Sequence, residues 1–274
     1  MDAASMSEQT NVPSHAVIVD TPDWRQVRPR IPDTPQRREL ERQRSVRELV
    51  FGIQDGILTT LGIATGVGIA EGKNWFVVIS GLLALLSGAL SMGVGSYLGG
   101  KAEREVVRAT IEMEKAEMDA NPHDEFAEQV AYYKLKGFSA DEAHTIVTRL
   151  AQNPEIYLYE MMRDEFGIDP RIAEEGGIRE ALSMAISFAV GAVLPLVPYF
   201  FSWPGRITLA VSLGFAVLGL FAVGYYAATL SNRSPWRKGV EIVLFGMAVF
   251  GISWLAGLFL PALFGHPGVT TLGG

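Results

Sequence analysis

The chain has 274 residues, of which 49% are hydrophobic, and its formal net charge at pH 7 is −7. The acidic balance argues against a nucleic-acid partner, and the absence of cysteine excludes thiolate metal sites and disulfides. The hydrophobic residues are concentrated in long runs, which argues against a soluble globular protein.

The N-terminal arm, residues 1–45, is polar and contains five prolines. It lacks the apolar core that a signal peptide would require. A segment of this composition cannot bury enough apolar surface to offset the cost of ordering its chain. We therefore expect the arm to be mostly disordered.

Five apolar runs are each long enough to cross a bilayer, because a helix of about 20 residues spans the hydrocarbon core. They lie at residues 49–70, 76–98, 181–201, 207–230 and 239–264. We expect an all-α membrane protein with a helical domain inserted between its second and third transmembrane helices. The predicted parts are the arm at 1–45, two transmembrane helices at 46–100, the inserted domain at 101–178, three transmembrane helices at 179–264 and a tail at 265–274.

Positive charges are distributed unevenly around these runs. Basic residues precede the first run, and the tail that follows Pro261 contains neither Lys nor Arg. The basic residues before the first run are Arg37, Arg38, Arg42, Arg44 and Arg47. Loops rich in Lys and Arg stay in the cytosol, so we expect the N-terminus and residues 101–178 to be cytosolic and the C-terminus to lie on the opposite side.

The first two runs carry the residues that could line an ion path. Asp55 lies about two helical turns inside the first run, where an ionisable group costs a few kcal/mol and usually faces a cavity or a partner. Gly52 and Gly56 beside it allow close helix packing. Met92 lies among small residues in the second run. Asp55 could instead cap a broken helix, and Met92 could simply fill a gap in the packing.

The second run continues without a break into a charged helix that should end near Asp119, before Asn121 and Pro122. Two Glu-x-x-Glu pairs flank this turn, and each pair points from one helix face. The pairs are Glu114 with Glu117 and Glu125 with Glu128. If the second helix folds back on the first, their carboxylates meet and require protons or a cation. The alternative is a solvated acidic face neutralised by Lys101, Arg104, Arg108 and Lys115.

Local signals divide the rest of the inserted domain into helices. Ser139 and Glu142 have the spacing of a capping box. Asn153 and Pro154 begin a further helix, with Pro at its first position. That helix carries two adjacent methionines and Glu165. Carboxylate oxygens suit hard divalent ions, and a thioether nearby extends the range to softer ions such as Fe²⁺.

These segments together resemble the vacuolar iron transporter family of the Ccc1 type, over residues 45 to about 262. The resemblance is carried by VRELVFGIQDGILTTLGIATGV, SGALSMGVGSYLGGKAEREV, EMEKAEMDANPHDEFAEQV, EIYLYEMMRDEFGIDP and SFAVGAVLPLVPYF. It implies a homodimer whose first two transmembrane helices form the ion path at the subunit interface. It also implies proton-coupled export of Fe²⁺ from the cytosol, with Mn²⁺, Co²⁺ and Zn²⁺ as further candidate ions.

The resemblance also assigns residues to both parts of the chain. It places Glu48, Asp55 and Met92 in the transport path. It assigns the metal site of the inserted domain to Glu114, Glu117, Glu125, Glu128, Met161, Met162 and Glu165. The expected partners are membrane lipid, a second copy of the chain, metal ions and protons, with no nucleic acid. The expected location is the cell membrane of a bacterium or the vacuolar membrane of a eukaryote.

One position departs from the family pattern. Plant members carry a glutamate eight residues before the methionine of the second transmembrane helix, and Ala84 occupies that position here. The departure puts the route of proton coupling in question. Two other functions stay open, namely a membrane-bound metal sensor and an iron-oxidising protein. A di-iron enzyme would need paired Glu-x-x-His motifs, whereas this chain has the spacing once, as Asp141 and His144, so we expect no enzyme.

The charge asymmetry leads to a topology prediction. A reporter fused after Gly274 should be active only on the non-cytosolic side of the membrane, because five crossings separate it from the arginine-rich N-terminus. A reporter inserted in the loop at Gly137 should be active in the cytosol. A cytosolic signal from the C-terminal fusion would show that the number of crossings is even.

Overall fold

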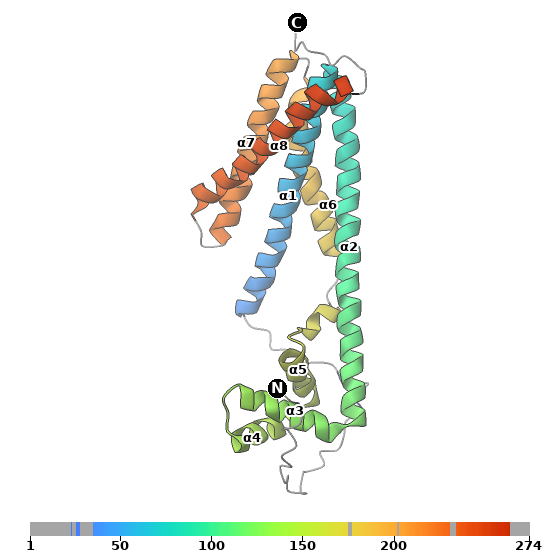
Figure 1. Ribbon diagram of the computed structural model, residues 1–274, viewed down its shortest axis with the longest axis vertical. Helices are drawn as coiled ribbons and strands as arrows, with labels where there is room; N and C mark the ends of the chain where they lie inside the picture. Colours follow the sequence, from blue (N-terminus) through green and yellow to red (C-terminus); the bar gives the residue numbers. More distant parts are fainter. Residues whose placement is uncertain are drawn as a thin grey trace. The chain divides into compact units, whose positions relative to one another are not determined.

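The computed structural model describes residues 23, 26–27, 35–174, 177–201, 203–230 and 234–263. Most of the predicted arm and the whole predicted tail, residues 265–274, lie outside this part of the chain. Within it the regular structure is entirely helical (Figure 1). The elements are α1 Pro35–Glu71, α2 Asn74–Ala120, α3 Pro122–Leu135, α4 Ala140–Ala151, α5 Pro154–Glu165, η1 Pro170–Glu174, α6 Gly177–Leu196, η2 Val197–Phe200, α7 Gly205–Leu230 and α8 Pro235–Leu263.

Five of these helices are long and apolar enough to cross a membrane, which confirms the prediction of an all-α protein with five transmembrane helices. They comprise Val46–Glu71, Asn74–Ala120, Gly177–Phe200, Gly205–Thr229 and Pro235–Pro261. Large apolar side chains such as Leu83 and Leu90 are exposed along them. In a bilayer these side chains face lipid, so their exposure carries no penalty.

Helix α2 is much longer than a bilayer is thick. Its 47 residues extend about 70 Å at 1.5 Å per residue, whereas the hydrocarbon core is about 30 Å thick. Only about half of the helix can therefore be in the membrane, and its composition identifies which half. The segment up to Gly100 is apolar, and the segment from Lys101 onward is highly charged.

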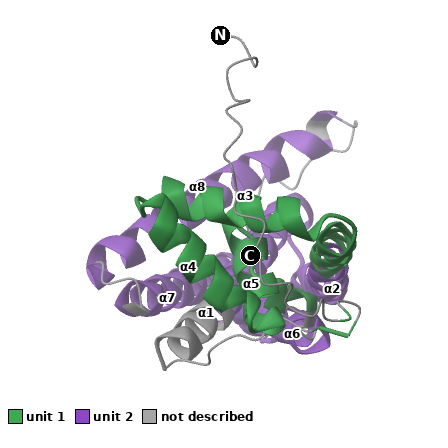
Figure 2. Ribbon diagram, turned by 90° about the horizontal axis from the view of Figure 1, so that it is seen from below, with its two compact units in different colours: residues 1–32, 103–175 green, residues 33–102, 176–274 purple. Residues whose placement is uncertain are grey.

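The chain divides into two compact units, which Figure 2 shows in different colours. Unit 1 contains residues 1–32 and 103–175, and unit 2 contains residues 33–102 and 176–274. The boundary within α2 lies between Ala102 and Glu103, close to the change from apolar to charged sequence.

The helices of unit 1 begin and end where local chemistry predicts. Ser139 accepts a hydrogen bond from the backbone N–H of Glu142, and the Glu142 carboxylate accepts one from the Ser139 backbone, so the capping box is present. The Asn153 side chain caps α5, and Pro154 occupies its first position. Gly137 and Gly167 follow α3 and α5 with φ of +100° and +64°, a region that glycine adopts without strain.

An apolar core holds unit 1 together. Helix α2 contributes Val107, Ile111 and Met118, which recur at helical spacing and therefore lie on one face. Val147 of α4 and Leu158 of α5 are fully buried against the same cluster. This packing fixes α5 against the charged half of α2.

In unit 2, α1 and α6 lie side by side (Figure 1), and their backbones come into contact at two glycines. A Cβ atom on Gly56 would lie 2.1 Å from the carbonyl oxygen of Phe188, and one on Gly191 would lie 2.0 Å from that of Ile53. Only glycine fits at either position. The small-residue pair at Gly52 and Gly56 therefore has the packing role that its spacing predicts.

Helix α6 packs on α2 as well. The ring of Phe188 lies over Gly88, where a Cβ would meet the ring at 2.3 Å. At its far end α6 changes into the η2 turn, and the carbonyl of Pro195 accepts a buried hydrogen bond of 2.7 Å from Ser212 Oγ of α7. The polar group released by this irregular backbone is thus satisfied inside the bundle, as a lipid environment demands.

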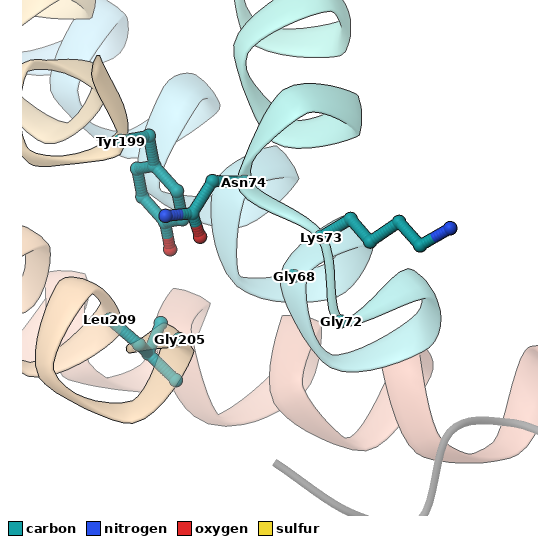
Figure 3. A pocket seen from close by; sticks show the side chains of 7 residues that line it. All are labelled: Gly68, Gly72, Lys73, Asn74, Tyr199, Gly205 and Leu209. Atoms are coloured by element: carbon teal, nitrogen blue, oxygen red, sulfur yellow. The ribbon is translucent and has the colours of Figure 1, made fainter. Parts of the chain in front are cut away.

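A cavity of about 10 Å³ lies at the turn between α1 and α2 (Figure 3). The side chains of Tyr199 and Asn74 meet beside it, and Lys73 points away. The Asn74 amide donates to the carbonyls of Phe201 and Trp203 at 3.4 and 3.3 Å. The cavity has room for about one water, and these polar contacts of Asn74 join the turn to the segment that follows η2.

The contact between α1 and α6 makes a stability prediction. Gly191→Ala should lower the free energy of unfolding by roughly 1–3 kcal/mol, because the added methyl group would overlap the backbone of Ile53. Gly214→Ala is the control, since a Cβ at Gly214 meets nothing within 4 Å. Thermal unfolding of the two purified variants in detergent compares the effects. Equal melting temperatures would mean that the two helices do not depend on this close approach.

Candidate metal centre

Three glutamates from three helices converge in unit 1. Glu114 comes from the charged half of α2, on the same face as Ile111 and Met118. The chain turns at Asn121, and Pro122 begins α3, which carries Glu125 in its first turn. Glu165 is the last residue of α5. The core that packs α5 on α2 therefore also brings the third carboxylate to the other two.

The carboxylates of Glu114, Glu125 and Glu165 each offer an oxygen atom, and the three atoms lie within 4.8 Å of one another. Glu114 is fully buried, Glu125 is buried with 8% exposure, and Glu165 is partly exposed. The site therefore has a closed inner end at Glu114 and an accessible side at Glu165.

Both carboxylate oxygens of Glu114 are buried without a hydrogen-bond partner in the described part of the chain. An ionised carboxylate in this position would cost several kcal/mol, so it must bind a proton or a cation. Two of the basic residues that could have neutralised it are engaged elsewhere. Lys115 pairs with Glu112 at 3.3 Å, and Arg108 donates to the carbonyl of Ala173.

The pKa values in the cluster reflect this environment. Burial and the negative charges of the neighbouring glutamates, Glu165 first among them, raise the pKa of Glu114 to about 8. Burial and the charge of Glu128 raise the pKa of Glu125 to about 7. Burial and the same neighbour raise the pKa of Glu165. At neutral pH in the absence of metal, the cluster therefore holds at least one proton.

The other predicted ligands of this domain lie around the three glutamates. Glu117 and Glu128 are exposed and do not belong to the group within 4.8 Å, although their charges raise the pKa values inside it. Met161 and Met162 are buried in the core of unit 1. The structure thus brings together three of the five predicted glutamates, with two more at the accessible side.

Sequence reasoning missed Tyr157, which is buried beside the site. Burial, followed by the charges of Glu125 and Glu114, raises the pKa of its phenol. Tyr157, Met161 and Glu165 recur every four residues along α5, so they form one row on that helix. This spacing is the signal that could have identified the tyrosine.

The arrangement suits one divalent cation. Oxygens bound to one ion at about 2.1 Å lie about 3.0 to 4.2 Å apart, so the glutamates need to close by roughly 2 Å or less. All three ligands are hard oxygens. His144 lies on α4, is exposed, and packs edge-on against Phe126, so it is not part of this group.

The predicted path residues lie in unit 2. Glu48 and Asp55 are partly exposed on α1, and Met92 is partly exposed on α2. Ala84 is also partly exposed on α2. Asp55 directly precedes Gly56, the residue at which the backbone of α1 touches α6. The aspartate is thus held on a closely packed part of the bundle.

The raised pKa values make a pH prediction for the metal-free protein. Between about pH 4.5, the ordinary value for glutamate, and about pH 8, the folded state binds more protons than the unfolded state. The stability of unit 1 should therefore be greatest at the acid end of this range and decrease as pH rises through it. Glu114→Gln, which resembles the protonated side chain, should flatten the decrease in thermal unfolding experiments.

Metal binding should depend on pH in the opposite direction to the stability of the metal-free protein. Mn²⁺ or Co²⁺ displaces protons from the cluster, so its affinity should fall by about tenfold per pH unit for each proton displaced as the solution is acidified. Calorimetry on the full chain between pH 6 and 8 measures this slope. An affinity independent of pH would mean that the ion binds at groups other than these glutamates.

Comparison with known proteins finds relatives that match residues in both units. The VIT family matches residues 46–258. Vacuolar iron transporter 1 of Oryza sativa is 30% identical over 73% of this chain and 79% of its own length. Vacuolar iron transporter 1 of Eucalyptus grandis is 27% identical over 76% and 85%, and protein CCC1 of Saccharomyces cerevisiae is 29% identical over 77% and 67%. The match extends from the first transmembrane helix through unit 1 to the fifth, and the chain therefore belongs to the VIT family.

Proposed function

We propose that this chain exports Fe²⁺ from the cytosol across the membrane in exchange for protons, and that it also accepts Mn²⁺. Family membership supports metal-ion transport as the general function. The observation that carries the proposal is the fully buried carboxylate of Glu114, which has no hydrogen-bond partner among the described residues and lies close to two further glutamates. Such a group needs a cation or a proton, and these are the two species that an antiporter exchanges.

Unit 1 serves as the capture site in this proposal. Glu114, Glu125 and Glu165 bind the ion, and the exposed Glu117 and Glu128 attract it and guide it inward. The two methionines, Met161 and Met162, supply polarisable sulfur close to the last glutamate and favour Fe²⁺ over harder ions. Co²⁺ and Zn²⁺, which accept the same ligands, are expected competitors.

The ion path lies along α1 and α2. Glu48 receives the ion near the start of the first transmembrane helix, Asp55 binds it inside the membrane, and Met92 adds a thioether from α2. An ionisable residue at this depth is rare without a functional partner. Because Ala84 replaces the glutamate of plant members, the exchanged protons pass through the remaining carboxylates of the path.

The chain acts as a homodimer in this proposal. Along α2, Ser87, Ser91, Gly95 and Gly99 recur every four residues and are exposed. A Cβ at either of the last two would meet nothing within 4 Å. A row of small residues at this spacing allows a second helix to approach closely in a membrane. Dimerisation through α2 places two copies of Met92 near one axis.

In the proposed orientation the N-terminus and unit 1 are cytosolic. This orientation rests on the arginines that precede the first transmembrane helix and on the absence of basic residues from the tail. The membrane is the vacuolar membrane in a eukaryotic cell or the cell membrane in a bacterium. Unit 1 then meets cytosolic ions before they enter the bilayer.

Transport into proteoliposomes that contain a pH-sensitive dye tests the proposal. Wild-type protein should move Fe²⁺ in one direction and protons in the other. Asp55→Asn keeps the size of the side chain but removes its charge, so transport should fall to the level of empty vesicles. Met92→Leu should slow Fe²⁺ more than Mn²⁺, because only the softer ion gains from sulfur. Glu241→Gln, which removes a carboxylate paired with Lys238 at 2.9 Å on α8, is the control.

The same experiment separates the alternative functions. A membrane-bound sensor would bind metal without moving it, and an iron-oxidising protein would convert Fe²⁺ to Fe³⁺ and consume oxygen. Wild-type rates in folded Asp55→Asn would contradict the path. Metal uptake without any proton signal would leave transport intact and contradict antiport.

A further inference from the structure

A second polar cluster joins α3 to α5 beside the three glutamates. The Asp164 carboxylate accepts a hydrogen bond of 2.9 Å from Gln129 Nε2 and forms a salt bridge of 2.5 Å with Lys136 Nζ. Gln129 is 1% exposed, and the side chain of Asp164 is 7% exposed. Lys136 lies over the ring of Tyr133 at 4.1 Å from its centroid. Here we call Gln129, Lys136 and Asp164 the latch.

Two of the latch residues are close in sequence to glutamates of the site, one on α3 and one on α5. Gln129 follows Glu125 by four residues on α3, so the two side chains leave the same helix face. On α5, Asp164 directly precedes Glu165. Any shift of α3 relative to α5 that breaks the latch therefore also changes the separation between Glu125 and Glu165.

The ion pair of the latch opposes the repulsion between the carboxylates of α3 and α5. Glu125 on α3 and Glu165 on α5 bring carboxylates of like charge within 4.8 Å of each other, so they repel when both are ionised. Repulsion between the two helices is therefore strongest when no metal is bound. The ion pair between Lys136 and Asp164 attracts the same two helices, and Gln129 adds a buried, uncharged contact.

We propose that the latch positions Glu125 and Glu165 for metal binding, by holding α3 on α5 while the site is free of metal. This inference rests on the proposed metal site. The latch residues are positioning residues: one oxygen of Asp164 is shared by two donors, and the converging group consists of Glu114, Glu125 and Glu165.

Lys136→Met separates positioning from simple electrostatics because the two effects have opposite signs. Removing a positive charge near a cation site should tighten cation binding through space. Loss of the latch should weaken it instead, since Glu125 and Glu165 then have to be brought together by the ion. We expect the Kd for Mn²⁺ to rise about tenfold, which corresponds to about 1.4 kcal/mol.

Lys134→Met is the matched control. Lys134 lies on α3 two residues before Lys136, is exposed, and carries the same charge. This variant should bind Mn²⁺ as tightly as wild type or slightly more tightly. Lys136→Arg keeps a charged donor and should restore the wild-type Kd. Gln129→Met, which changes no charge, should weaken binding in the same direction as Lys136→Met.

The measurement is Mn²⁺ calorimetry on the purified full chain in detergent, together with the melting temperature of each metal-free variant. The proposal is supported if Lys136→Met and Gln129→Met weaken binding while the folded protein persists below its melting temperature. It is overturned if both variants bind Mn²⁺ as wild type does, or more tightly. Glu114→Ala separates the metal site from the latch. Loss of binding in this variant alone would support the metal site and reject the latch. A wild-type chain that binds no Mn²⁺ would reject both.

Discussion

The convergence of three carboxylates, two of them buried, is the constraint on which unit 1 depends. Glu114 lies on the apolar face of α2 and has no hydrogen-bond donor in the described structure. Such an arrangement is unfavourable when all three groups are charged and nothing is bound. It becomes favourable when protons or a divalent cation compensate the charge. Competition between metal and protons is therefore what this arrangement predicts for the proposed site.

The apolar core makes this unfavourable arrangement possible. Ile111 and Met118 lie on either side of Glu114 along α2, and Leu158 and Met161 pack from α5. This packing brings the helices together in spite of their acidic residues. Ion pairs such as that between Lys136 and Asp164 also hold the helices together. The site therefore depends on apolar burial and on ion pairs that lie outside it.

The membrane unit is held together by a different principle. Helices in lipid gain little from burying apolar side chains, so they associate through close packing and satisfied polar groups. The mutual contact of α1 and α6 at Gly56 and Gly191 is of the first kind, and the bond from Ser212 to Pro195 is of the second. The predicted path residue Asp55 lies next to the tightest of these contacts.

The amino-acid sequence by itself determined the five transmembrane helices, the length of α2, and the caps at Ser139 and Asn153. Each of these follows from composition or from spacing within one short segment, where local physics is sufficient. The sequence also allowed Glu114 and Glu125 to meet if the helix after Asn121 and Pro122 folds back on α2, but it left a solvated acidic face equally open.

Only the tertiary structure decided which acidic residues form the site. Glu114 and Glu117 have the same chemistry and lie on one helix, yet the first is fully buried and the second is exposed. The difference arises from α5, which packs on α2 from a position about 50 residues further along the chain and brings Glu165 and Tyr157 with it. The partners of Asp164 likewise come from another helix. Spacing along the sequence carries no information about such contacts, because they depend on how separate helices pack against one another.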